Sequence, residues 1–273
     1  MRLASSGAYR LLRSSGVSHS MNPTKNCKYD VKSPEQLLNY WFQDNRGRDS
    51  VEDKWFKFGK LYDAEIKEMF GDTLSACIEG YLSRWLRTKN GTLAYIILTD
   101  QFPRHIYRGH EASFAFDPLA LSAAKRAIQH FGIETFKSTE VTFILLPFMH
   151  SEEIKDHIQG IKVMNSVLRR RPADQRLISA LASLIANKSI VEKFGRIPTR
   201  NKVLGRLSTE EEQIYLLSLR GVPVDLTFFN YLGGKMAKDE TDLSVFFYLG
   251  GRMSSQGYGA KRDEVCHDAT SKL

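Results

Sequence analysis

Asp100-Gln101-Phe102-Pro103-Arg104 is the stretch around which the rest of this 273-residue chain is organised. It follows an apolar helical pattern and places a carboxylate and a guanidinium four residues apart, on one face of a helix. Pro103 then breaks or kinks the backbone where the two charges lie. Because a buried ion pair is costly unless its members are fully hydrogen-bonded, this pattern predicts a polar site at a helix break.

Helical periodicity continues towards the N-terminus of this stretch. Ser33-Pro34-Glu35-Gln36 has the residues of a helix start: a capping Ser, Pro at the first position and Gln three residues after the cap. Two more helices are predicted before residue 90. We expect Gly71-Asp72 to divide them and Asn90-Gly91 to end the second, because Gly favours helix ends and Asp favours helix starts.

The pattern after residue 105 also predicts helices joined by short loops. We expect Asp117 to cap a helix that ends near Gly132, and Ser138 to cap an apolar, central helix that Pro147 bends. No segment before residue 224 alternates with the period of a strand. The chain is therefore predicted to be all-α, an array of antiparallel helices. Further helices are predicted at 154–168, 174–194 and 208–220.

Three parts of the chain differ in composition. Residues 1–30 are interpreted as a basic leader or disordered tail, since the first 29 residues hold five Lys or Arg and no Asp or Glu. Residues 31–221 carry the helical pattern and form the predicted domain. Residues 222–273 are interpreted as an extension, with two similar Phe-Phe…Gly-Gly segments and a polar end that we expect to be disordered.

The leader explains much of the net charge of +8, because without its five cations 34 basic residues face 31 acidic ones. That balance argues against a nucleic-acid partner. An acid-free leader rich in Ser and Arg is typical of a mitochondrial transit peptide, so we predict a mitochondrial protein. If translation starts at Met21, most of that signal is lost and a cytoplasmic protein is expected instead.

The longest apolar run and the cysteine residues limit the class of protein further. Val141 to Met149 is the longest nearly unbroken apolar run, far short of the roughly 20 residues of a membrane span. We therefore predict a soluble protein with no membrane span. The three Cys residues form no C-x-x-C pair, which argues for a reducing compartment and against a structural zinc site.

Charged side chains scattered over a hundred residues are predicted to meet inside the molecule, because Asp100 and His150 both point inward by helical periodicity. Arginines hold carboxylates or phosphates in two-point contacts, and an imidazole acts as acid or base. A closed ion-pair network that only fixes how helices cross is the alternative. The predicted ligand-binding residues are Arg104, Asp117, Arg196, Arg200 and Asn201. The predicted catalytic residues are His150, Glu152 and Asp100.

The sequence is compatible with three functions. The first is a binding protein that holds a small anionic ligand, a peptide end or a protein partner in the interior cluster. The second is an enzyme that uses His150 in acid–base chemistry with Arg clamps. The third is a mitochondrial assembly or RNA-associated factor that uses the basic region at 169–206. His150, Glu153 and His157 have the spacing of metal ligands on a helix, but we assign no metal site and no cofactor.

Rare sequence strings give a separate signal over residues 35–215. In order along the chain these strings are Tyr40-Trp41-Phe42, Lys54-Trp55-Phe56, Asp63-Ala64-Glu65-Ile66, Asp100-Gln101-Phe102-Pro103-Arg104, Ile106-Tyr107-Arg108-Gly109, Asp117-Pro118-Leu119-Ala120, Leu146-Pro147-Phe148-Met149-His150-Ser151-Glu152, Phe194-Gly195-Arg196-x-Pro198-x-Arg200-Asn201 and Leu204-Gly205-Arg206.

With these strings the chain resembles the uncharacterised bacterial family known as domain of unknown function 924. The resemblance implies an all-helical fold similar to tetratricopeptide-repeat domains, and it implies no activity. The chain departs from the family at three positions: it has His105 where members usually carry Asn, and Asn187 and Thr199 where members carry His. If those histidines are catalytic in the family, part of the machinery is missing here.

Overall fold

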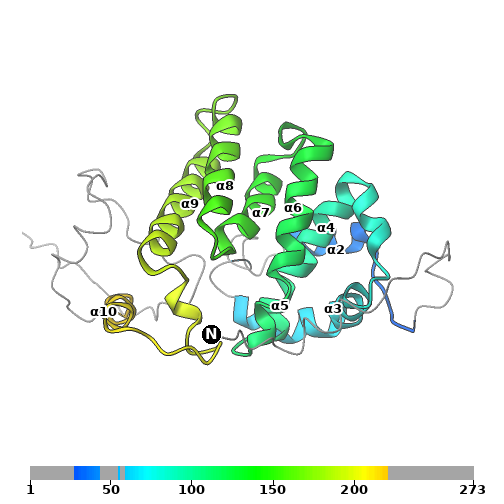
Figure 1. The fold of residues 1–273 in the computed structure, drawn as a ribbon. Coiled ribbons are helices and arrows are strands. Elements are labelled where there is room, and N and C mark those ends of the chain that lie inside the picture. Colours follow the sequence, from blue (N-terminus) through cyan, green and yellow to red (C-terminus); the bar gives the residue numbers. More distant parts are fainter. Residues whose placement is uncertain (1–27, 44–54, 56–58, 221–273) are drawn as a thin grey trace, which may run out of the picture.

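The computed structural model describes residues 28–43, 55 and 59–220, and over these ranges the protein is helical without any strand (Figure 1). Helices α6 to α9 run alternately up and down in the view of Figure 1, so neighbours are antiparallel. The predicted all-α helical array is confirmed. The α-helices are α2 Pro34–Phe42, α3 Asp63–Ile78, α4 Lys89–Asp100, α5 Phe102–Ile106, α6 Asp117–Phe131, α7 Ser138–His150, α8 Ile154–Leu168, α9 Gln175–Phe194 and α10 Glu210–Ser218. The 3₁₀ helices are η2 Gly59–Tyr62, η3 Ser83–Arg87, η4 Glu111–Ser113, η5 Ile133–Thr135 and η6 Pro198–Arg200.

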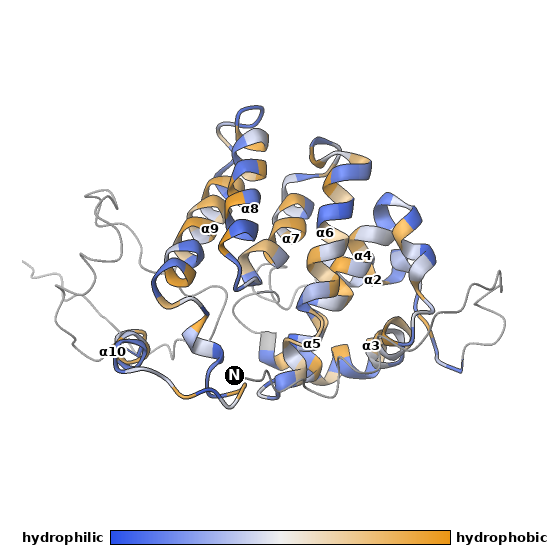
Figure 2. Ribbon diagram, viewed as in Figure 1, coloured by the Kyte–Doolittle hydropathy of each residue, from blue (hydrophilic) through white to orange (hydrophobic). Residues whose placement is uncertain are grey.

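Helices α4 and α7 form the centre of the molecule. Every residue of α4 from Gly91 to Asp100 is buried, and so is every residue of α7 from Phe143 to His150. Helix α4 packs against α2, α6 and α7, while α7 also packs against α8 and α9. Figure 2 shows apolar residues where these helices face one another and polar residues in the turns at their ends. The apolar helix is therefore central, as its sequence predicts.

Aromatic rings fill the space between α2, α5 and α7. The Trp41 ring meets the rings of Phe102 and Phe143 edge-on, with centroids 5.4 and 5.6 Å apart. Trp55 lies 4.8 Å from Phe143 and donates from Nε1 to the carbonyl O of Trp41 at 2.9 Å. Edge-to-face contacts of this kind add to the free energy that burial of the rings contributes. They hold α2 against α5 and α7.

The boundary predicted at Gly71 is wrong, because α3 continues through this residue to Ile78. Phe70 and Leu74, on either side of Gly71, are both fully buried. Their burial stabilises the helix by more than the roughly 1 kcal/mol that a Gly costs in a helix interior. Asp72 does not cap a helix; its Oδ2 accepts from the backbone N of Asp30 at 3.1 Å.

Asn90-Gly91 also behaves differently from the prediction, since these residues lie in the first turn of α4. Thr88 caps this helix, and its Oγ1 accepts from the backbone N of Gly91 at 3.1 Å. A Cβ at Gly91 would lie 2.2 Å from the backbone O of Trp85. Gly is therefore required here for close packing against the preceding 3₁₀ turn, not for a helix end.

The remaining helices agree with the prediction to within about two residues, with differences at their caps. Asp117 is the first residue of α6 rather than its cap, and its carboxylate is turned towards two arginines. Helix α6 ends at Gly132 with a φ of 75°, as expected. Ser138 likewise begins α7 rather than capping it, and Pro147 lies inside that helix.

Two predicted parts of the chain lie largely or wholly outside the described residues: the leader, of which only residues 28–30 are described, and the extension at 222–273. Within the ranges that the structure does describe, none of the helices combines the length and the apolar character needed to cross a membrane.

Candidate functional site

The end of α4, the short α5 and the end of α7 bring three predicted site residues together. Gln101 separates α4 from α5, and Pro103 occupies the first turn of α5, where a missing N–H costs nothing. His150 Nδ1 lies 2.7 Å from Asp100 Oδ1, and Arg104 Nη2 lies 2.8 Å from the same Nδ1. Arg104 Nη2 is also 3.4 Å from Asp100 Oδ1. The predicted meeting of these residues is therefore present in the structure.

Asp117 and Arg200 complete the outer side of this group. Arg104 Nη2 donates to Asp117 Oδ1 at 2.8 Å, and Arg200 Nη1 lies 3.1 Å from Asp117 Oδ2. The ring of Phe114 lies against both guanidiniums, 5.4 Å from that of Arg104 and 4.6 Å from that of Arg200. Such cation–π contacts orient arginines as well as attracting them. We call this group the central cluster; its members are Asp100, Arg104, Phe114, Asp117, His150 and Arg200.

Exposure rises across the central cluster from its inner to its outer side. The side chains of Asp100 and His150 are 1% and 6% exposed, whereas those of Arg200, Asp117 and Arg104 are 11%, 13% and 20% exposed. Two carboxylates face two guanidiniums, so the cluster is neutral while the imidazole is neutral. The outer side is the one that a molecule from solution can reach.

The inner pair has shifted titration. Burial would raise the pKa of Asp100, but the charges of His150 and Arg104 outweigh it and hold that pKa well below its usual range. Gln101 Nε2 also donates to Asp100 Oδ2, which favours the ionised carboxylate. The pKa of His150 is lowered from 6.5, mainly by burial and then by the nearby charge of Arg104. At neutral pH the site therefore holds an ionised Asp100 beside a neutral imidazole.

The ring nitrogen Nδ1 of His150 is approached by a donor and an acceptor at once. A neutral imidazole uses Nδ1 either to donate to Asp100 or to accept from Arg104, since one nitrogen carries either a proton or a lone pair. Among the described residues, none is hydrogen-bonded to the other nitrogen, Nε2. Nε2 is therefore the atom of the ring that is left to exchange a proton with a bound molecule.

Glu152, Arg196 and Asn201, which were predicted to share this site, belong to a second network. Arg206 donates to both oxygens of Glu152 at 2.7 and 3.0 Å. Arg196 donates to both oxygens of Glu212 at 2.6 and 2.7 Å, and Asn201 Nδ2 donates to Glu212 at 3.1 Å. We call these five residues the η6 clasp. The clasp fastens η6 and α10 to the turn after α7, and so it holds Arg200 in place.

One member of the central cluster, Phe114, and one of the η6 clasp, Arg206, were not predicted from the sequence pattern. Phe114 belongs to no helical stripe, because it follows η4 in the connection between α5 and α6. Arg206 lies in the string Leu204-Gly205-Arg206, which marked the residue as part of a motif, but only the fold shows that it bonds with Glu152. Side chains from irregular segments have no periodicity from which their direction could be predicted.

The three residues at metal-ligand spacing do not converge. His150 is engaged at Nδ1, and His157 donates from Nε2 to the carbonyl O of Ser151 at 2.8 Å. Glu153 points to solvent beside Lys155, 3.6 Å away. Nowhere in the described part of the chain do three His, Cys, Asp or Glu side chains form a group suited to a metal ion.

Two positions at which the chain departs from the family pattern lie in contacts of their own. His105 Nδ1 is 2.9 Å from Asp63 Oδ1, and Arg108 holds the same carboxylate at 2.5 and 2.7 Å. Asn187 Nδ2 donates to the backbone O of Ser183 in its own helix at 3.0 Å. The partners in these contacts, Asp63 and Ser183, lie outside the central cluster.

The basic region at 169–206 is divided among several structural contacts. Arg171 donates to the backbone O of Phe136 at 2.9 Å. Arg196 and Arg206 belong to the η6 clasp, and Arg200 pairs with Asp117. These four guanidiniums are already engaged and are not free to form part of a track for phosphates. What remains of the basic region therefore gives little support to a role as an RNA-associated factor.

The comparisons with known proteins agree with this fold. A family described as "Bacterial protein of unknown function (DUF924)" matches residues 37–219, and the chain belongs to that family. The solved structure of the protein of unknown function ATU0120 from Agrobacterium tumefaciens is similar at 30% identity and a TM-score of 0.57, over 68% of this chain and 97% of that chain. No curated protein matches the sequence. The family and the solved relative are thus described without an activity.

The predicted mitochondrial location is wrong. The family is described as bacterial, and the solved relative also comes from a bacterium. The prediction rested on composition alone, and a segment rich in Arg and Ser without acid has that composition whether or not an import system reads it. The same finding removes the mitochondrial assembly role.

Proposed function

We propose that the central cluster binds the acidic group of a small ligand, which Arg104 and Arg200 hold in the place that the carboxylate of Asp117 occupies. One observation carries this proposal: a single carboxylate is bridged by two guanidiniums from different parts of the chain, at 2.8 and 3.1 Å. This is the arrangement by which a carboxylate or phosphate is bound between arginines.

The outer side of the cluster supports the same interpretation. Both arginine side chains are partly exposed, and the Phe114 ring lies against their guanidiniums. An aromatic ring next to a charged clamp offers an apolar surface to the body of a ligand while the clamp holds its acidic group. Because the two arginines already face two carboxylates, the ligand must compete with Asp117 for them.

That competition gives a direct test with Asp117→Asn and inorganic phosphate as the probe. Two unit charges about 4 Å apart interact by ~4 kcal/mol at an effective dielectric constant of 20. Partial exposure reduces this to about 1–2 kcal/mol, so removal of the carboxylate charge should tighten phosphate binding about tenfold. Arg200→Ala should abolish it. Isothermal titration calorimetry and the phosphate-dependent rise in Tm measure both effects.

Asp156→Asn is the matched control, because Asp156 is a buried carboxylate that pairs with Lys125 at 2.6 Å outside the cluster. It should leave the affinity for phosphate unchanged. If Asp117→Asn lowers the Tm and phosphate restores none of it, the cluster is a structural network and the proposal fails.

A second candidate, acid–base catalysis on the bound ligand, is favoured by the orientation of His150. Asp100 lies on Nδ1, Nε2 has no partner among the residues described, and the pKa of the ring is lowered. A neutral imidazole held in this way is suited to act as a general base. Turnover of p-nitrophenyl acetate that is lost in His150→Gln, with phosphate affinity retained, would support it. Equal turnover in both proteins would exclude it for this substrate.

A further inference from the structure

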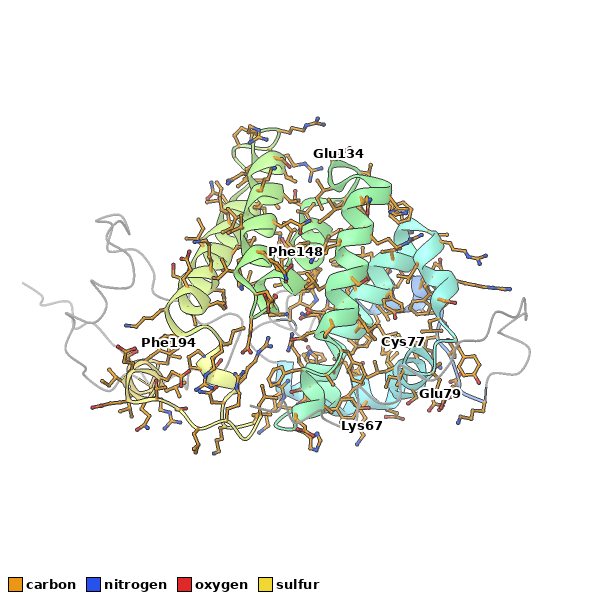
Figure 3. The ribbon with its side chains drawn as sticks, in the orientation of Figure 1. Lys67, Cys77, Glu79, Glu134, Phe148 and Phe194 are labelled. Carbon is orange, nitrogen blue, oxygen red and sulfur yellow. The ribbon has the colours of Figure 1, made fainter. Side chains whose placement is uncertain are left out.

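A cavity of about 410 Å³ lies at the C-terminal end of α8, away from the central cluster. The 15 residues of α8 span about 22 Å, and His150 lies near the other end of this helix. Figure 3 labels Glu134, which marks the end of the helical array where the cavity lies. The cavity is lined by Ile133, Glu134, Ser166, Val167, Arg169, Arg170 and Arg171.

The lining combines an apolar base with a basic rim. Ile133 and Val167 are 7% and 3% exposed, so they form part of the packed interior. The charged residues of the lining are three arginines and one glutamate, Glu134. A volume of this size is in the range of small-molecule sites, roughly 300–1,000 Å³, which are mostly apolar with a few polar groups that fix orientation.

The three arginines differ in what they already bind. Arg171 donates to the backbone O of Glu134 at 3.1 Å, to that of Phe136 at 2.9 Å and to Ser138 Oγ at 3.2 Å, so it holds the wall of the cavity. Arg169 and Arg170 are exposed, and neither side chain is hydrogen-bonded or ion-paired with another described residue. Two guanidiniums are therefore available at the rim of a cavity whose wall the third one fixes.

We propose that this cavity is a second binding site, which takes a small organic anion: a carboxylate or phosphate carried on a short apolar body. The apolar body lies on Ile133 and Val167, and Arg169 and Arg170 hold the acidic group.

The dipole of α8 also acts on these arginines, because they follow the C-terminal end of this helix. Arginines at a helix C-terminus also offset the negative end of its dipole, which is worth about half an elementary charge. Exposed arginines here therefore have a structural explanation as well. That half charge cancels only part of the excess of two positive charges in the lining, so the cavity still attracts an anion.

Phenyl phosphate is the probe that matches this chemistry, with inorganic phosphate as the probe that lacks the apolar body. In the full-length protein, phenyl phosphate should shift the backbone amide resonances of Ser166 and Val167. The double variant Arg169→Ala, Arg170→Ala should weaken its binding at least tenfold, because hydrogen bonds between charged groups are each worth about tenfold or more. Inorganic phosphate should bind this cavity several-fold more weakly than phenyl phosphate.

Lys162→Ala combined with Lys202→Ala is the charge-matched control, since both lysines are exposed and neither lines the cavity. It should change the affinity by less than twofold. Equal weakening in the two double variants would show a general charge effect and overturn the proposal. It would also be overturned if Ser166 and Val167 do not shift, or if a single-stranded oligonucleotide displaces phenyl phosphate from them. The test does not depend on phosphate binding at the central cluster. Ser166 and Val167 lie near the C-terminal end of α8, whereas the central cluster lies near its N-terminal end.

Discussion

Acidification should destabilise the folded protein through His157, a fully buried imidazole in α8. Its Nε2 donates to the carbonyl O of Ser151 at 2.8 Å, whereas Nδ1 is buried with no hydrogen-bond partner among the residues described. Burial lowers the pKa of His157 from 6.5. The charges of His150 and Lys188 lower it further, while Ser151 and Asp156 act against them.

The sign of the effect follows from where the protons bind. As the pH falls below about 6.5 the unfolded imidazole takes up a proton, but the folded one stays neutral until a lower pH. The unfolded state then binds more protons, so the free energy of unfolding decreases as the pH falls through this window. For one imidazole the slope approaches about 1.4 kcal/mol per pH unit. His150, whose pKa is also lowered by burial, contributes in the same direction.

Urea unfolding at intervals between pH 5 and 8 measures this slope. His157→Gln keeps a donor for Ser151 and removes the titrating ring, so it should make the loss of stability between pH 8 and pH 5 smaller than in the wild type. His130→Gln, at an exposed position near the end of α6, is the control and should leave the slope unchanged. If His157→Gln shows the full slope of the wild type, the buried imidazole does not carry the linkage and the reasoning is refuted.

Two further predictions concern stability. Gly91→Ala places a Cβ 2.2 Å from the backbone O of Trp85, so urea unfolding should show a loss of roughly 2–3 kcal/mol or more. Gly71→Ala, whose Cβ would meet no described atom within 4 Å, should instead stabilise the protein by up to about 1 kcal/mol; a loss in both variants would contradict the distinction. Glu152→Gln removes the charge that holds Arg206 in the η6 clasp. Since Glu152 is partly exposed, it should cost about 1 kcal/mol, and hydrogen exchange should be faster at Arg200 but unchanged in α4.

The comparison of Gly71 with Gly91 shows why helix boundaries were predicted less well than the helices themselves. Both residues look like helix breakers in the sequence, and both lie inside a helix. What separates them is the neighbour that a Cβ would meet, and that is a property of the tertiary packing. The segment Val141 to Met149 was predicted well because burial on all sides leaves a signal in the sequence itself.

The candidate site was predictable to the extent that its residues lie on regular helices. Asp100 and His150 were expected to point inward, and they meet at 2.7 Å. Arg196 and Arg200 lie four residues apart in sequence, yet one bonds with Glu212 and the other with Asp117. Between the end of α9 and η6 the backbone has no regular period, so charge and proximity alone could not separate the central cluster from the η6 clasp.

Arg200 is the last residue of η6, which follows the long helix α9, and this late position in the sequence has a consequence for how the protein folds. Contacts between residues this far apart in the sequence are slow to form, because closing the long loop between them costs conformational entropy. Without the Arg200 guanidinium, Asp100 and Asp117 would share the single guanidinium of Arg104, which would leave one negative charge at the centre uncompensated. The Arg200 side chain thus neutralises the interior, and it makes the stability of the central cluster depend on the position of η6.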